Sequence, residues 1–347
     1  MKFYPIYLLL IFLFGCSSND NHRETPPSNE TNTMENKTYP TTGSIERLDK
    51  TINQLIPKEA FIEILAEGFT WSEGPLWIEE GQYLLFSDIP PNNIMKWNES
   101  DGATLYLHPS GYTGTAERGG EPGSNALILN KNGQLVLCQH GDRRMATMKS
   151  DLSNPKSEFS TIVDNYQGKK LNSPNDAVYD TQGNLYFTDP PYGLEKNVND
   201  PAKELDFQGV FRYSKAGQLT LITDKITRPN GIGLSPDEKT LYVSCSDPEA
   251  ATWTAFTLND DGTVASERLF YDATNMVGKG KGLPDGLKVD KQGNIWATGP
   301  GGVWVFNSEA KVLGKILTGE ATSNCAFDAS QKTLYMTCDD YLMRIKL

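Results

Sequence analysis

The chain has 347 residues, of which 38% are hydrophobic and 22% are charged, and its formal net charge is −12. This length and hydrophobic content are enough for one large domain with a sizeable core. The negative charge argues against nucleic acid or an anionic membrane surface as the partner of the folded part, because an acidic protein is repelled by both.

The first sixteen residues have the layout of an export signal. Lys2 precedes a nearly unbroken apolar run, residues 3–14, which is too short to span a membrane. The run ends in Leu13-Phe14-Gly15-Cys16, which resembles a bacterial lipobox, although Phe14 departs from the small residue usual there. We therefore expect residues 1–16 to be a lipoprotein signal in which Cys16 carries the lipid. An ordinary cysteine in a hydrophobic segment is the alternative.

Residues 17–44 consist mainly of Ser, Asn, Thr, Pro and Glu, with almost nothing to bury. Such a composition predicts a disordered tether, because little apolar burial offsets the entropy lost on ordering. The tether would attach a folded domain, residues 45–347, to the bacterial cell envelope, in the periplasm or at the outer membrane. Contact with the membrane would then be through the lipid anchor alone.

The clearest hairpin pattern lies between Asn175 and Asp189. Residues 177–180 and 185–188 are β-branched or aromatic runs on either side of a Gly-containing turn, which is typical of two short paired strands. Because a hairpin returns the chain to its starting point, Asp189 should lie near Asn175. Polar oxygens should therefore gather at one end of this hairpin.

The same pattern occurs six times along the chain. In each copy a polar residue is followed, ten or eleven positions later, by the first apolar residue of the second strand, and successive copies are 39 to 55 residues apart. This spacing is close to the about 40–50 residues of a four-stranded propeller blade. We therefore predict an all-β fold, a six-bladed β-propeller, with the leading residues in a ring at one mouth of its channel. These residues are Glu73, Asn125, Asn175, Asn230, Asp285 and Asn324.

A ring of two carboxylates and four amides suits a hard divalent cation, because Ca²⁺ takes carboxylate, amide and water oxygens. Any one of these residues alone is an ordinary turn residue. Their repetition at equivalent positions favours a central divalent metal site.

Two further segments should reach the same mouth. Residues 112–123 form a long Gly-rich loop before Asn125, in which Arg118 and Glu121 are candidates for substrate contact; a plain solvent loop is the alternative. His140 ends the second strand of the second hairpin, so it should face the pocket as a general base or a hydrogen-bond donor. A surface or capping histidine is the alternative.

Two predictions concern packing. A strand at residues 61–65 could pair with residues 341–346 and so close the ring. Four cysteines lie in apolar strand contexts without zinc spacing, and we interpret them as buried free thiols. They are Cys138, Cys245, Cys325 and Cys338.

Four motifs, in this order, resemble the gluconolactonase and regucalcin (senescence marker protein) family of six-bladed propellers. They are Ser72-Glu73-Gly74-Pro75, Asn172-Ser173-Pro174-Asn175-Asp176 with Phe187-Thr188-Asp189-Pro190-Pro191-Tyr192-Gly193, Arg228-Pro229-Asn230-Gly231 and Leu283-Pro284-Asp285-Gly286. The resemblance implies a divalent cation, usually calcium, held by Glu73, Asn175, Asn230 and Asp285, with magnesium, manganese or zinc as alternatives. It also implies hydrolysis of sugar lactones with Asp285 as general base.

Two details bear on the substrate. Regucalcin-type members commonly carry an arginine, which reads the sugar, two residues before the metal-binding Asn; here that position is Ser173, which leaves the substrate open. Residues 139–144 are similar to bacterial gluconolactonases, which favours a pocket role for His140.

Together these features predict a metal-dependent hydrolase that opens sugar lactones to aldonic acids. The cation would polarise the carbonyl and Asp285 or His140 would deprotonate water, while Asn125, Asp189 and Tyr192 would orient substrate hydroxyls. Two alternatives stay open. One is a non-catalytic, envelope-tethered propeller that binds a sugar or a partner with a structural calcium, and the other is an esterase or phosphotriesterase of non-sugar substrates.

Overall fold

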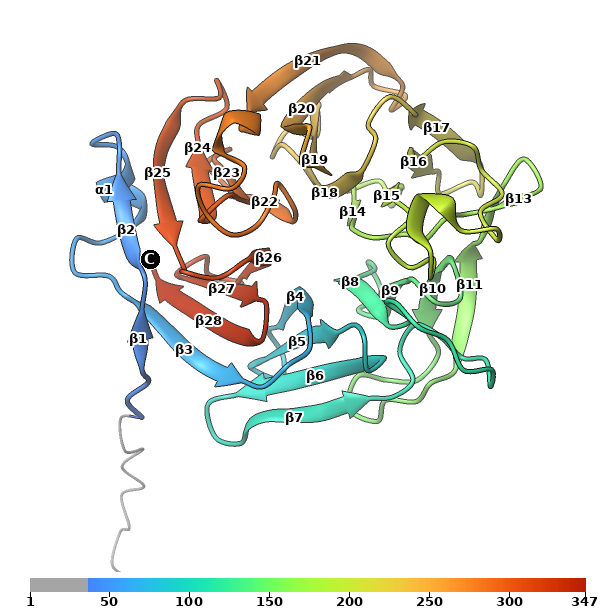
Figure 1. Ribbon diagram of the computed structural model, residues 1–347, viewed down its shortest axis with the longest axis horizontal. Helices are drawn as coiled ribbons and strands as arrows, with labels where there is room; N and C mark the ends of the chain where they lie inside the picture. The colour runs from blue at the N-terminus through green and yellow to red at the C-terminus, as the bar shows by residue number, and fades with distance from the viewer. Residues whose placement is uncertain (1–36) are drawn as a thin grey trace, which may run out of the picture. The chain divides into compact units, whose positions relative to one another are not determined.

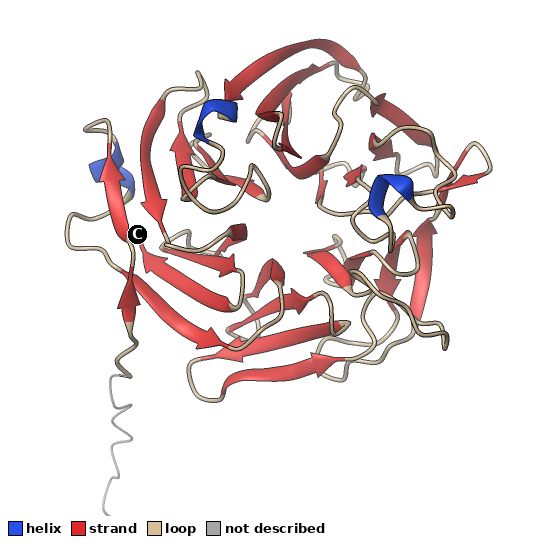
Figure 2. Cartoon of the chain, viewed as in Figure 1, coloured by secondary structure: helices blue, strands red, loops and turns tan. Residues whose placement is uncertain are grey.

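Antiparallel strands form nearly all the regular structure of residues 37–347, the part of the chain that the computed structural model describes. Six sheets of four or five strands surround a central axis (Figure 1). Helical segments in this part are short (Figure 2): α1 (Ile52–Leu55), η1 (Asn197–Asn199) and η2 (Thr274–Met276). The predicted six-bladed β-propeller is therefore confirmed.

Each blade is an antiparallel meander whose first strand lies nearest the axis (Figure 1). The strands of the first two blades, from the axis outward, are β4 (Ser72–Ile78), β5 (Tyr83–Asp88), β6 (Asn93–Asn98) and β7 (Gly102–Leu107), then β8 (Ser124–Leu129), β9 (Leu135–Gln139), β10 (Arg144–Met148) and β11 (Phe159–Val163). Those of the next two are β14 (Ala177–Tyr179), β15 (Leu185–Asp189), β16 (Gly209–Tyr213) and β17 (Leu219–Thr223), then β18 (Pro229–Leu234), β19 (Thr240–Asp247), β20 (Ala250–Leu258) and β21 (Val264–Asp272). A two-stranded ribbon, β12 (Asn165–Tyr166) and β13 (Lys169–Lys170), precedes the third blade.

Strands from the N-terminal side complete the last two blades. The fifth blade contains β22 (Leu287–Val289), β23 (Ile295–Gly299), β24 (Gly302–Phe306), β25 (Val312–Leu317) and β2 (Ser44–Arg47). The sixth contains β26 (Thr322–Phe327), β27 (Thr333–Cys338), β28 (Tyr341–Lys346), β3 (Ile62–Glu67) and β1 (Thr41–Thr42). Because β28 pairs with β3, the predicted closure of the ring is confirmed.

The predicted tether, residues 17–44, includes residues that belong to the folded domain. Thr41 and Thr42 pair with β3, and Ser44 pairs with Leu317 of β25, so the compact unit begins at Tyr39 and not at residue 45. These polar residues are ordered because their backbone groups join two sheet edges, which their composition does not reveal. Residues 1–36, which include the signal with Cys16 and most of the predicted tether, lie outside the described residues. Residues 37–347 contain no helix long and apolar enough to cross a membrane.

Apolar side chains fill the space between neighbouring blades. Trp253 and Trp304 pack between the fourth and fifth blades with ring centroids 5.8 Å apart, and Phe187 and Phe211 stack within the third blade at 5.4 Å. Cys138, Cys245, Cys325 and Cys338 are buried free thiols, as predicted. Burial raises the pKa of Cys325 and Cys338 to about 12, so these thiols stay protonated and contribute as small apolar groups.

Candidate active site at the mouth of the central channel

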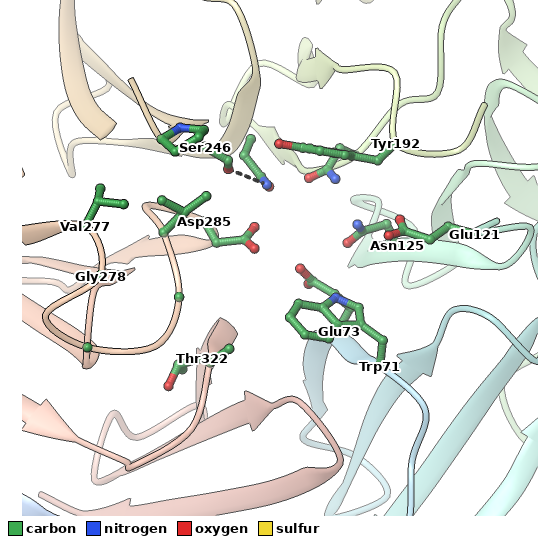
Figure 3. A pocket seen from close by; sticks show the side chains of 17 residues that line it. Trp71, Glu73, Glu121, Asn125, Tyr192, Ser246, Val277, Gly278, Asp285 and Thr322 are labelled. Atoms are coloured by element: carbon green, nitrogen blue, oxygen red, sulfur yellow. Dashed lines mark hydrogen bonds between the residues drawn. The ribbon is translucent and has the colours of Figure 1, made fainter. Parts of the chain in front are cut away.

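A pocket of about 470 Å³ opens at one mouth of the channel, and residues from all six blades line it (Figure 3). Five of the six predicted ring residues are in its wall. They are Glu73, Asn125, Asn175, Asn230 and Asp285. The hairpin repeat therefore predicted correctly which residues the propeller brings together from distant parts of the chain.

Local breaks in strand pairing turn the ring side chains towards the pocket. The register of the inner strands shifts just after Glu73 in the first blade and across Asn230 in the fourth, as in β-bulges that re-aim a side chain. Glycine follows each of these residues. A Cβ on Gly74, whose φ is +53°, would lie 2.2 Å from the Asn125 carbonyl oxygen, so a larger residue would push the first two blades apart.

Four oxygen atoms in the pocket wall are buried without a hydrogen-bond donor. They are the Oδ1 atoms of Asn125, Asn175, Asn230 and Asp285. Buried acceptors without partners are costly and therefore rare. A cation would satisfy such oxygens, so the residues present fit a divalent metal ion.

Two of the three carboxyl groups that line the pocket, Glu73 and Asp285, have a raised pKa in the absence of a metal. Burial raises the pKa of Glu73 to about 8, and the charge of the nearby Asp176 contributes to this rise. Burial, together with the charges of Glu73 and Glu121, raises the pKa of Asp285 well above its usual value. A divalent cation would reverse both shifts by favouring the ionised forms.

The side-chain atoms in the pocket wall that are placed to coordinate a metal ion are oxygens, and several of them belong to amide groups. Within residues 37–347, no group of three or more His, Cys, Asp or Glu side chains is arranged to hold a metal ion. A site of two carboxylates plus amides suits a hard cation better than a thiophilic one.

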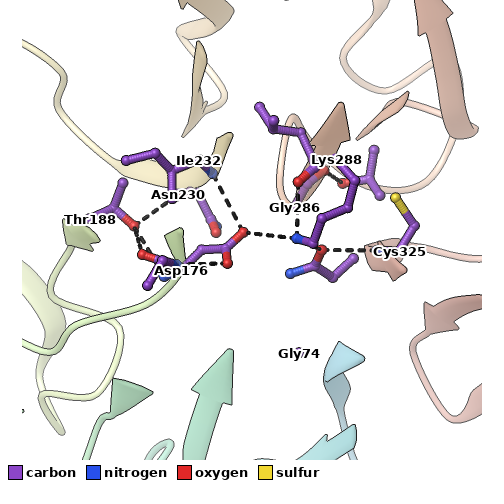
Figure 4. Close-up of polar contacts among 12 residues, drawn as sticks. Gly74, Asp176, Thr188, Asn230, Ile232, Gly286, Lys288 and Cys325 are labelled. Atoms are coloured by element: carbon purple, nitrogen blue, oxygen red, sulfur yellow. Dashed lines mark hydrogen bonds and ion pairs between the residues drawn. The ribbon is translucent and has the colours of Figure 1, made fainter. Parts of the chain in front are cut away.

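Asn324, the sixth predicted ring residue, does not line the pocket but belongs to a second polar layer with Asp176 and Lys288, which Figure 4 labels. Its Nδ2 donates to Glu73 Oε2 at 3.3 Å, and its Oδ1 accepts from Lys288 Nζ at 3.2 Å. Lys288 Nζ also lies 3.5 Å from Asp176 Oδ2. This layer supports the Glu73 carboxylate and supplies a positive charge near the ring; the sequence prediction missed it.

Three of the predicted substrate-contact residues line the pocket: Asn125, Glu121 and Tyr192. Arg118 does not. Its Nη1 donates to the Gly141 carbonyl at 2.8 Å and its Nη2 donates to the Gly193 carbonyl, so its guanidinium holds the 112–123 loop against two neighbouring segments.

Asp189 also lies outside the pocket, contrary to its predicted substrate role. Its carboxylate accepts hydrogen bonds from the Asn172 and Ser173 backbone amides at 2.8 Å, and burial raises its pKa to about 7. Asp88 likewise accepts from the Thr70 and Trp71 amides at 3.0 Å in the first blade. In these two blades the strand-end carboxylate fixes the loop that leads into the inner strand.

His140 is fully buried and does not line the pocket. Its Nδ1 lies 3.3 Å from Oε2 of Glu121, which does line the pocket. Gly193 covers it so closely that a Cβ there would lie 2.5 Å from His140 Cβ and 2.7 Å from Ser173 Cβ. In this structure the Gly193 segment separates His140 from the pocket, and the contact of His140 with a pocket-lining residue is with Glu121; the predicted pocket role of His140 stays a prediction.

The sequence prediction also missed part of the pocket wall. Trp71 and Ser246 face the ring, and a segment from Val277 to Leu283 forms one side (Figure 3). The signal for that segment is its glycine content directly before Asp285, which parallels the Gly-rich 112–123 loop before Asn125.

A six-bladed propeller with buried carboxylate and amide oxygens at one mouth of its channel defines the class of this protein. The chain belongs to the SMP-30/gluconolactonase/LRE-like family, whose sequence model matches residues 71–339. It is 38% identical over 312 residues to the gluconolactonase of Zymomonas mobilis, covering 88% of this chain and 86% of that protein.

Solved structures show the same relationship. The gluconolactonase of Xanthomonas campestris superposes with a TM-score of 0.74 at 30% identity, over 90% of this chain and 99% of that chain. A structure described as a putative gluconolactonase gives a TM-score of 0.75 at 32% identity, over 87% and 97%. The calcium-binding protein regucalcin of Agrobacterium tumefaciens shares the fold, with a TM-score of 0.63 at 17% identity over 81% and 92%.

Proposed function

We propose that this protein is a metal-dependent hydrolase that opens sugar lactones to aldonic acids. The observation that carries the proposal is the cluster of four unpartnered buried oxygens, one of them from Asp285, in one pocket with the carboxyl group of Glu73. Relatives named gluconolactonase, at 38% and 30% identity, support this reaction.

Four residues would hold the cation: Glu73, Asn175, Asn230 and Asp285. When bound, the ion supplies Lewis acidity that polarises the lactone carbonyl and stabilises the negative charge that develops on its oxygen. Calcium is favoured because the donors are carboxylate and amide oxygens; magnesium, manganese and zinc are the alternatives to be tested.

The remaining chemistry belongs to side chains of the chain itself. Asp285 lies at the pocket surface with its Oδ1 free of hydrogen-bond donors, so it is suited to accept a proton from the attacking water. Asn125 and Tyr192 lie across the pocket from Asp285, in positions to orient substrate hydroxyls (Figure 3). Trp71 presents a flat apolar surface against which a sugar ring could pack.

The test is lactone opening by the purified protein in a pH-indicator assay with each of the four metals. We expect turnover of an aldonolactone that disappears on chelation, and a loss of at least about 100-fold in Asp285→Asn with the fold retained. Asp224→Asn, an exposed carboxylate outside the pocket, is the matched control. If no aldonolactone is opened, or if Asp285→Asn alters only ion affinity, the propeller is a binding protein; turnover of non-sugar esters alone identifies an esterase.

We also propose that the protein is a lipoprotein of the bacterial cell envelope, anchored through Cys16. The apolar run that ends at this cysteine supports the proposal. The Cys16→Ser variant should leave the membrane fraction and lose incorporation of labelled fatty acid. Unchanged fractionation and labelling would contradict the anchor.

A further inference from the structure

A third carboxyl group of the pocket, that of Glu121, lies next to a buried histidine. Glu121 lines the pocket, and its Oε2 lies 3.3 Å from Nδ1 of His140. His140 is fully buried, and neither of its ring nitrogens makes a hydrogen bond within the described structure. The proposed role of Asp285 as general base assigns no function to Glu121 or to His140.

The backbone fixes this pair in place. The His140 amide donates to the Gly123 carbonyl and the Gly141 amide donates to the Pro122 carbonyl, both at 3.2 Å, so the two segments run side by side. Arg118 ties the same loop to the Gly141 and Gly193 carbonyls. Glu121 is therefore carried on a braced loop, although the loop lies at the surface.

Glu121 and Asp285 lie on opposite sides of the pocket, with Glu73 between them (Figure 3). A lactone between them would have one carboxyl group on the side of the attacking water and another on the side of the ring oxygen.

Lactone opening requires two proton transfers, because the water loses a proton and the departing ring oxygen must gain one. The ring oxygen of a sugar lactone leaves as an aliphatic alkoxide, which is a poor leaving group without a proton donor. Asp285, as the base, serves the first transfer from its side of the pocket. A carboxyl group on the opposite side, such as Glu121, can serve the second.

We propose that Glu121 is the general acid of lactone opening and that His140 is the positioning residue that holds its carboxyl group. This inference rests on the proposed lactonase function. The water oxygen bonds to the carbonyl carbon while one water proton passes to Asp285. The bond from that carbon to the ring oxygen then breaks as the ring oxygen takes the proton of Glu121. Asp285 afterwards releases a proton to solvent and Glu121 regains one, so one water is consumed per hydroxy acid formed.

The decisive experiment varies the leaving group. Glu121→Gln is compared with the wild-type protein on an aldonolactone and on dihydrocoumarin, whose phenolate leaves without prior protonation. We expect kcat/KM to fall by about 100-fold for the aldonolactone and by less than about threefold for dihydrocoumarin. Asp285→Asn should lose activity on both, and Glu117→Gln, an exposed carboxylate on the same loop, should lose it on neither.

His140 is tested by the same comparison. His140→Leu should lower kcat for the aldonolactone with little change in KM, His140→Gln should recover part of the loss, and the double variant with Glu121→Gln should be no worse than Glu121→Gln alone. Should His140→Leu fail to fold, the selectivity of Glu121→Gln still decides. Equal losses on both substrates, or none, would overturn the role of Glu121. If the wild-type protein opens neither substrate, the proposed function itself is overturned.

Discussion

The side-chain amide of Asn230 donates to Ser246 Oγ at 2.8 Å, and Ser246 Oγ donates in turn to the Pro284 carbonyl at 2.6 Å. These bonds join the fourth blade to the segment that carries Asp285. With its Nδ2 engaged, Asn230 turns its Oδ1 to the pocket, where no donor meets it. The orientation of a proposed metal ligand is thus set by a hydroxyl on the neighbouring strand.

Ser246→Ala should therefore weaken calcium binding by about threefold to tenfold, because one hydrogen bond contributes about 0.5–1.5 kcal/mol. Isothermal titration calorimetry on the metal-free protein measures this directly. Ser244→Ala is the matched control, since the Ser244 hydroxyl is buried two residues earlier on β19 and makes no hydrogen bond. Equal affinities in the two variants would contradict the positioning of Asn230.

The stability of the metal-free protein should depend on pH through Glu73. Folding raises the pKa of this carboxyl from 4.5 to about 8, so the native state keeps a proton that the unfolded chain releases. This contribution is present below the unfolded pKa and is lost as pH rises through about 8. The melting temperature should therefore decrease as the pH is raised from 4.5 to about 8. Calcium should reverse this decrease because it binds the ionised carboxylates.

Glu73→Gln should make the pH dependence of the metal-free protein shallower, since the substituted amide does not titrate while Asp285 still does. Differential scanning calorimetry from pH 5 to 9 provides the comparison. A metal-free protein whose stability is independent of pH across this interval would show that Glu73 is ionised without the metal.

The closure of the ring depends on a buried ion pair between the last strand and the third. Arg344 Nε of β28 lies 2.5 Å from Glu63 Oε2 of β3, and the two side chains are only 7% and 10% exposed. Arg344→Met leaves the Glu63 carboxylate buried without its partner, which typically costs about 3–5 kcal/mol. Urea denaturation should show this loss, and the double variant with Glu63→Gln should recover much of it. Lys346→Met, an exposed change on the same strand, should have little effect.

Arg118 should act on the loop and not on the substrate. Arg118→Met removes its hydrogen bonds to the Gly141 and Gly193 carbonyls, so residues 112–123 should be cleaved faster in limited proteolysis and KM should rise. Glu195→Gln, which changes a carboxylate 4.0 Å from Arg118 Nε, should leave proteolysis nearly unchanged. A specific loss of kcat without faster cleavage would instead indicate substrate contact.

The architecture was predictable because each blade repeats the same short hairpin pattern in its sequence. Alternating apolar strands and Gly-containing turns are local patterns, so six copies indicated six blades and aligned Glu73 with Asp285 across 212 positions. The extent of the first strands was not predictable, because Thr41 and Ser44 are ordered by the sheet edges they meet and not by their own propensity.

The sequence by itself determined five residues of the pocket wall, since periodicity specifies equivalent positions without specifying what each side chain meets. Only the tertiary structure decided their roles. In the structure Asp189 accepts hydrogen bonds from backbone amides, Arg118 donates to backbone carbonyls and His140 contacts Glu121. The side-chain Oδ1 atoms of Asn175 and Asp285 have no hydrogen-bond donor. The physical reason is that a polar side chain takes its function from the groups that satisfy it, and those groups come from other blades.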